Sequence, residues 1–115
     1  MSTLVRRIIR ADGTEQDLPG PLPYRELAKM IDARACDTVA LRHLGQPLHV
    51  MLVDDYGYET ETITLRPGLI EQRPVRALKP VNVKATALYH AECVPGTTHQ
   101  IVGDVVVVPD DDFAD

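Results

Sequence analysis

The sequence predicts a small α+β domain, in which two helices pack on a mixed, mostly antiparallel sheet. Three features support this: short β-branched runs between Gly and Pro turns, two segments with apolar residues at helical spacing, and a closing apolar run, QIVGDVVVVP, of strand length. The expected order of elements is β-β-α-β-β-(β)-α-β. The chain has 115 residues, which suits one domain. We expect this domain to span 1–109 and an acidic tail to occupy 110–115.

The first half of the chain predicts a hairpin, a helix and a second hairpin. TLVRRIIR is rich in β-branched residues, and the Asp12-Gly13 pair after it is typical of a hairpin turn, because Gly accepts a positive φ. TVALRH and LHVMLVDD flank a short turn and predict a second hairpin. Between the hairpins, YRELAKMIDARA carries apolar residues on one helical face: Tyr24, Leu27, Ala28, Ile31 and Ala35.

The second half predicts a turn at Gly57, a short strand at TITL, a capped helix and a buried strand. Three prolines in RPGLIEQRPVRALKP favour an irregular segment, and the path of Arg66–Lys79 is left open. Asn82 is a good N-cap for a helix over NVKATALYHAE, with Ala85 on its apolar side. The run that contains Val105–Val108 predicts a central strand buried on both faces, because almost every residue in it is apolar.

The stretch YHAECVPGTTHQIVGD, Tyr89–Asp104, admits two interpretations. It could hold a metal or a catalytic pair, or it could join the end of a helix to the central strand. His90, Cys93 and His99 are the candidate ligands, but they lie on a helix end, a loop and a strand start, and zinc needs a fourth ligand. That ligand would be His43 or His49, if the second hairpin lay adjacent.

We favour the structural interpretation of this stretch. A Cys93–His99 nucleophile pair would need an orienting third group, and the sequence shows none. We therefore expect no catalytic residue, no metal and no cofactor. PGTT could form a small anion nest, but a turn explains it without a ligand. Structural roles are expected for Gly57, Asn82, Ala85, Gly96, Gly103 and Asp104.

Composition excludes some partners and permits others. The net charge of −5 disfavours direct nucleic-acid binding, which depends on Lys and Arg, and permits a basic protein partner. The start, MSTLVRRIIRADG, lacks the long apolar stretch of a signal peptide, and no run approaches about 20 apolar residues, so we expect neither a signal peptide nor a membrane span. Two cysteines indicate reduced thiols and a cytoplasmic location.

Acidic residues gather in two places. They are Asp54, Asp55, Glu59 and Glu61 around one turn, and Asp110, Asp111, Asp112 and Asp115 in the tail. On one face they could dock a basic host protein or imitate a row of phosphates. A solvated surface that aids solubility is the favoured interpretation.

Three segments, LHVMLVDDYG, LKPVNVKATALY and QIVGDVVVVP, resemble the bacterial and phage family called domain of unknown function 3846. The matching residues are Asp54, Asp55, Gly57, Pro80, Asn82, Ala85, Thr86, Ile101, Gly103 and Asp104. YETETITLRPGLIEQRPVRALK departs from the pattern, because the family passes quickly from the Gly turn to the Asn segment. The resemblance implies carriage on phages, plasmids or integrated elements and implies no reaction.

The leading hypothesis is therefore a non-enzymatic accessory protein of a mobile genetic element that acts by protein–protein contact, with a basic host or element-encoded protein as its partner. The alternative is a small-molecule or nucleotide-binding module, or a minor enzyme of nucleotide metabolism, that uses the Tyr89–Asp104 turn. A third hypothesis is self-association through the VVVV strand, which would require this strand to lie at a sheet edge. The sequence does not predict the oligomeric state.

Overall fold

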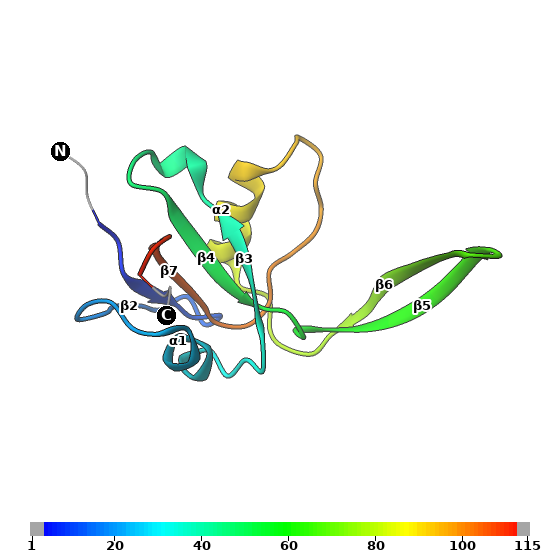
Figure 1. Cartoon of the computed structure of the whole chain (residues 1–115), viewed down its shortest axis with the longest axis horizontal. Helices are drawn as coiled ribbons and strands as arrows, with labels where there is room; N and C mark the ends of the chain where they lie inside the picture. The colour runs from blue at the N-terminus through cyan, green and yellow to red at the C-terminus, as the bar shows by residue number, and fades with distance from the viewer. Residues whose placement is uncertain (1–3, 113–115) are drawn as a thin grey trace.

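The computed structural model describes residues 4–112 and shows a five-stranded antiparallel sheet with a helix on each face, plus a two-stranded arm (Figure 1). This confirms the predicted α+β class, although every strand pair is antiparallel. In chain order the elements are β1 (Arg7–Ile9), β2 (Glu15–Asp17), α1 (Tyr24–Met30), β3 (Cys36–Ala40), the 3-10 helix η1 (Arg42–Leu44), β4 (His49–Asp54), β5 (Tyr58–Arg66), β6 (Leu69–Ala77), α2 (Val83–Glu92) and β7 (Val105–Pro109).

The last strand, β7, is the centre of the main sheet, whose order is β2-β1-β7-β4-β3. Its valines alternate between two apolar clusters, as the pleat of a strand requires. Val106 and Val108 pack with Leu27 of α1, whereas Val105 and Val107 pack on the α2 side. The prediction of a central strand buried on both faces is confirmed, so the VVVV run does not offer a sheet edge.

The first helix is shorter than its apolar pattern suggests. It ends at Met30, because Ile31 leaves helical geometry and Asp32 has a φ of +53°. Leu27 and Ile31 are buried against the sheet as predicted. The Lys79 ammonium donates to the carbonyls of Ile31 and Asp32, at 3.3 and 2.7 Å, and so satisfies groups that a helix end leaves free.

The second hairpin forms as predicted, with Cys36 opposite Asp54 and Ala40 opposite Val50. Its first strand nevertheless stops at Ala40, so the expected extension through His43 is wrong. Leu41 is fully buried in the α2-side cluster, and the chain then turns into η1.

The second helix begins at the predicted cap. The Asn82 side-chain oxygen accepts a hydrogen bond from the Ala85 amide at 3.0 Å. The side-chain amide of Asn82 also donates to the carbonyls of Ile9 and Gly103, at 2.9 and 3.0 Å. Asn82 is only 1% exposed. Its side chain therefore links the start of α2 to Ile9 and Gly103 inside the protein.

The path of Arg66–Lys79 is the main correction to the expected order of elements. The segment expected to be irregular contains a nine-residue strand, β6, and the short strand expected at TITL is the nine-residue β5. Pro67 lies in the turn between them. Pro74 is opposite Thr60, next to a β-bulge, where a missing amide is tolerated.

The predicted acidic tail is described only as far as Asp112. Asp110 donates from its amide to the Leu48 carbonyl at 2.9 Å, and the Asp112 carboxylate pairs with the Arg6 guanidinium at 2.5 Å. These contacts attach 110–112 to the body. Residues 113–115, including Asp115, lie outside the described residues.

Candidate functional site

The hairpin of β5 and β6, which we call the arm (Tyr58–Ala77), projects from the body (Figure 1). The molecule consequently measures 52 × 29 × 29 Å. The two strands pair with each other and with no strand of the main sheet. No strand of the described chain pairs with the outer edges of the arm, and its side chains lie on a surface with no core beneath it. A hairpin of this kind is only marginally stable by itself.

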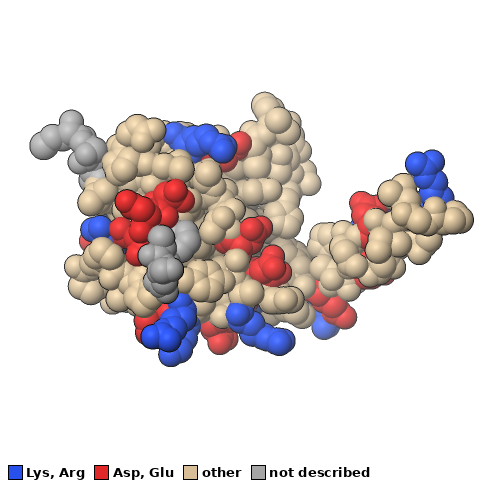
Figure 2. All heavy atoms as spheres, in the orientation of Figure 1, with Lys and Arg blue, Asp and Glu red and all other residues tan. Residues whose placement is uncertain are grey.

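The arm carries much of the exposed apolar surface. Within the described residues, ten large hydrophobic side chains are exposed, and five of these lie on the arm or directly after it: Leu65, Leu69, Ile70, Val75 and Leu78. Ile70 and Val75 are 63% and 57% exposed. Figure 2 shows the arm standing clear of the body, with wide uncharged areas between its charged side chains. Clustered exposed apolar residues mark interaction sites more often than scattered ones do.

Strand register gives the arm one charged face and one uncharged face, because residues opposite each other in an antiparallel pair share a face. The charged face holds Glu59 opposite Arg76, Glu61 opposite Arg73, and Ile63 opposite Glu71. The other face holds three pairs without charge: Thr60–Pro74, Thr62–Gln72 and Thr64–Ile70. The arm therefore differs from a uniformly solvated loop.

The root of the arm is fastened to the body. The Leu78 amide donates to the Gly57 carbonyl at 2.9 Å and closes the hairpin. The Lys79 ammonium pairs with the Asp54 carboxylate at 2.6 Å, and the Asp54 side chain is only 5% exposed. Gly57 has no room for a side chain, because a Cβ there would lie 2.7 Å from a methyl group of Val102. These contacts fix the direction in which the arm leaves the sheet.

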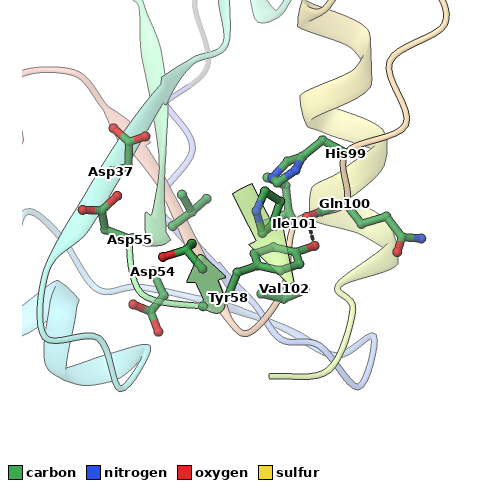
Figure 3. A pocket seen from close by; sticks show the side chains of 12 residues that line it. Asp37, Asp54, Asp55, Tyr58, His99, Gln100, Ile101 and Val102 are labelled. Atoms are coloured by element: carbon green, nitrogen blue, oxygen red, sulfur yellow. Dashed lines mark hydrogen bonds between the residues drawn. The ribbon is translucent and has the colours of Figure 1, made fainter. Parts of the chain in front are cut away.

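A pocket of about 240 Å³ opens at this root (Figure 3). One wall is formed by Asp37, from β3, and Asp55. Tyr58 and His99 lie across from them. The Tyr58 hydroxyl donates to the Gln100 carbonyl at 2.6 Å, which joins the arm to the segment before β7. Burial raises the pKa of Tyr58. The pocket therefore lies between the arm and the body and depends on both.

The lining of the pocket suits a cation. Asp37 and Asp55 supply exposed carboxylates, and the ring of His99 packs against Tyr58 at 5.4 Å and edge-on against Tyr89 at 5.7 Å. Carboxylates beside aromatic rings attract ammonium and guanidinium groups. The same carboxylates repel phosphates, so this lining opposes a nucleotide guest.

The predicted ligand candidates of the Tyr89–Asp104 stretch have structural contacts. His90 Nε2 lies 2.7 Å from the His99 carbonyl, and Cys93 follows the last residue of α2. Cys93 beside the Tyr89 hydroxyl, together with burial, raises the pKa of Tyr89. Across residues 4–112, no three His, Cys, Asp or Glu side chains gather where a metal ion could bind. His99 alone of the three candidates lines the pocket.

The two histidines considered as a fourth zinc ligand also have other partners. His49 is 2% exposed, accepts from the Val5 amide through Nε2 at 2.9 Å, and lies with Nδ1 2.9 Å from the Pro47 carbonyl. His43 contacts Glu92 through its ring and its amide. The other cysteine, Cys36, has a thiol pKa raised by burial, which opposes a nucleophilic role.

The residues expected to be structural have structural surroundings. Gly96 has a φ of +96°, in the turn after α2, and Gly103 has a φ of +77° just before β7. The Gly103 amide donates to the Pro80 carbonyl at 2.8 Å, so two backbone segments approach closely here. The Asp104 carboxylate accepts from the Ala11 amide and pairs with Arg10, both at 2.9 Å. Ala85, in the first turn of α2, is fully buried.

Most of the acids around the Gly57 turn have basic neighbours. Asp54 pairs with Lys79, Glu59 pairs with Arg76 at 2.9 Å, and Glu61 lies opposite Arg73. Two acids of the cluster, Asp54 and Glu59, are therefore neutralised by residues of β6 and its end, whereas Arg73 pairs with Glu71 at 3.0 Å. Asp55 stays on the pocket wall, where Asp37 joins it from a different strand.

A second hollow, of about 450 Å³, lies beside α2 on the face of the sheet formed by β1 and β7, and its lining is mainly apolar. Its charged residues pair with one another: Glu15 binds Lys84 at 2.8 Å and Arg7 at 3.4 Å. The contact between His43 and Glu92 holds η1 against α2 at one end of this hollow.

That contact makes stability depend on pH. The His43 amide, and after it the His43 ring, hold the pKa of Glu92 below its usual range. A depressed pKa stabilises the fold above the pKa of the unfolded chain, and this contribution disappears as the pH falls through the folded pKa. We expect the unfolding free energy of the wild type to fall more steeply on acidification than that of Glu92→Gln. Parallel curves from urea titrations at several acidic pH values would contradict this.

Sequence reasoning missed the pocket and the uncharged face of the arm. Asp37, the Asp55–Tyr58 turn and His99 come from three separate places in the chain, and no local pattern joins them. The arm did leave a signal. Pro67-Gly68 is a turn pair between two alternating segments, and Gly68 adopts a φ of +81°.

Comparisons of the chain with protein-family models, with curated proteins and with solved structures give no match. No helix in the described part of the chain combines the length and the apolar character needed to cross a membrane.

Proposed function

We propose that this protein acts by protein–protein contact, through the arm and the acidic pocket at its root, as a non-enzymatic accessory protein. The observation that carries the proposal is the arm itself. The arm exposes both faces and both edges of a hairpin. Half of the large hydrophobic side chains that are exposed in the described residues lie on the arm or directly after it. Exposed edges and apolar clusters are costly to a free protein and useful to a bound one.

The chemistry of the pocket indicates which kind of partner the arm binds. Asp37 and Asp55 line the pocket across from Tyr58 and His99, and the whole chain carries a net charge of −5. A lysine or arginine side chain of a partner fits this lining, because carboxylates and aromatic faces both attract it. The proposed partner is therefore a protein with a basic segment, either from a host or from the same genetic element.

The setting of a mobile element is proposed from the resemblance to the domain of unknown function 3846 family. The segment that interrupts the family pattern, 58–79, coincides with the arm and its root. We infer that the arm is an addition to a common body and gives this chain its own partner. A cytoplasmic location belongs to the same proposal, and the two cysteines, Cys36 and Cys93, are free thiols as that location requires.

Shortening the arm tests the proposal. Glu59 is opposite Arg76, so an Asn-Gly turn can replace Thr60–Val75 and leave a short hairpin. We expect the shortened chain to keep its body and to lose the proteins that the wild type captures from a host lysate. Mass spectrometry of the captured proteins and thermal unfolding of both chains measure this.

The pocket has a matched control. Asp37→Asn with Asp55→Asn should weaken the same capture and reduce its sensitivity to salt. Asp110→Asn with Asp111→Asn removes the same charge from exposed positions outside the pocket and should leave capture unchanged. Equal capture by the full and shortened chains would refute the proposal.

A further inference from the structure

We propose that one partner of the arm is a second copy of this chain, which pairs antiparallel with the outer edge of β6 about a two-fold axis at Gln72. The inference rests on the proposed function, because it names an occupant for the arm. Within residues 4–112, β6 has β5 along one side and no strand along the other. Such an edge offers unpaired amides and carbonyls to another strand.

The sequence of β6 is complementary to itself about Gln72. In LIEQRPV, Leu69–Val75, two apolar residues, an acid, Gln72, a base and two apolar residues follow in order. An antiparallel pair centred on Gln72 places Glu71 of each copy opposite Arg73 of the other. It also places Ile70 opposite Pro74. Opposite charges and apolar pairs at facing positions are the contacts that stabilise neighbouring strands.

Other registers lack this complementarity. An axis at Glu71 places the two glutamates opposite each other, and an axis at Arg73 does the same to the two arginines; like charges at facing positions are destabilising. The outer edge of β5 carries Glu59 and Glu61 and has no basic residue before Arg66, at its end. Charge complementarity therefore selects the β6 edge and the Gln72 register.

The shape of the molecule permits this pairing. The arm stands clear of the body (Figure 1). Gln72 lies near the middle of β6, Leu69–Ala77. Antiparallel arms therefore place the two bodies at opposite ends of a four-stranded ribbon. Pro74 lacks an amide, so the ladder has no donor at this position of either copy. Four strands relieve the marginal stability of an isolated hairpin.

A charge-reversal experiment tests the second copy. Sedimentation velocity across a concentration series should show the wild type in equilibrium between monomer and dimer. Glu71→Arg and Arg73→Glu, each alone, put like charges at both facing positions and should weaken dimerisation about tenfold or more. An equimolar mixture of the two single variants should dimerise again, because one copy is then basic and the other acidic at these positions.

Two further chains complete the experiment. Glu71→Arg combined with Arg73→Glu in one chain restores opposite charges across the axis and should dimerise like the wild type. Glu26→Arg makes the same change of charge as Glu71→Arg, but on α1, where the Glu26 side chain is 47% exposed. This variant should dimerise like the wild type. Restored dimers in the mixture also show that both single variants still fold their arms.

Contrary results separate the two proposals. The proposal that the arm binds a second copy is refuted if the wild type stays monomeric at every concentration, or if the mixture of the two variants fails to dimerise. If the shortened arm still abolishes capture of host proteins in that case, the proposed function stands. A dimer that neither charge reversal weakens overturns the β6 edge as the contact.

Discussion

Replacing Asn82 by alanine is expected to lower the free energy of unfolding by about 3 kcal/mol or more. The substitution removes the cap of α2. It also removes the two hydrogen bonds that the Asn82 side-chain amide donates to the buried carbonyls of Ile9 and Gly103. Asn82 is 1% exposed, so water does not readily replace these bonds. Urea denaturation followed by circular dichroism measures the loss. A change under about 1 kcal/mol, the value of a cap alone, would show that the interior bonds contribute nothing.

A second substitution at this position separates the cap from the interior bonds. Asn82→Asp keeps an acceptor for the Ala85 amide but turns a carboxylate oxygen toward the Ile9 and Gly103 carbonyls. The pKa of the introduced carboxyl should therefore be raised in the folded state, because the protonated form can donate. Its penalty is full above the folded pKa and vanishes below the unfolded pKa. We expect the loss of unfolding free energy in Asn82→Asp, relative to the wild type, to shrink as the pH falls. The loss in Asn82→Ala should not show this dependence on pH.

Asn82 also shows how far local sequence reaches. The capping role follows from Asn before a helical pattern, and the structure confirms it. The two interior bonds depend on Ile9, 73 positions away, and on Gly103, 21 positions away. Only the folded sheet brings these carbonyls to the helix start, so no local pattern could predict them.

The central strand and the arm mark the two limits of prediction from periodicity. Val105–Val108 lie between two helices, and an uninterrupted apolar run predicts that environment directly. The arm has no buried face, so its residues alternate without a strong apolar signal, and its prolines predict an irregular segment. Pro67 in fact occupies the turn and Pro74 lies beside a bulge, the two places where a hairpin accepts proline.

The pocket escaped prediction for a different reason. Its carboxylates and rings lie at strand ends and in loops, where burial imposes no pattern on the sequence. Asp54 and Asp55 are adjacent in sequence and both border the pocket (Figure 3). The Asp54 carboxylate nevertheless pairs with Lys79, whereas the Asp55 residue is exposed. Adjacent residues of a strand end point in different directions, so charge clusters read from sequence mix structural acids with accessible ones.

The second large effect is expected at Gly103. Gly103→Ala should destabilise the protein by about 3 kcal/mol, because two penalties add. The φ of +77° disfavours any Cβ, and that Cβ would lie 2.8 Å from the Lys79 side chain. Lys79 cannot move freely, since its ammonium pairs with Asp54 at 2.6 Å and donates to the Asp32 carbonyl at 2.7 Å.

Gly96 supplies the matched control for this prediction. Its φ is +96°, and a Cβ there meets nothing within 4 Å, so Gly96→Ala should cost only the backbone penalty of about 1–2 kcal/mol. The difference between the two variants measures the contact with Lys79. Combining Gly103→Ala with Lys79→Ala removes that contact, so the double variant should lose less stability than the sum of the single variants. Strict additivity, or equal losses at Gly96 and Gly103, would contradict the role of Gly103 in holding Lys79 at the root of the arm.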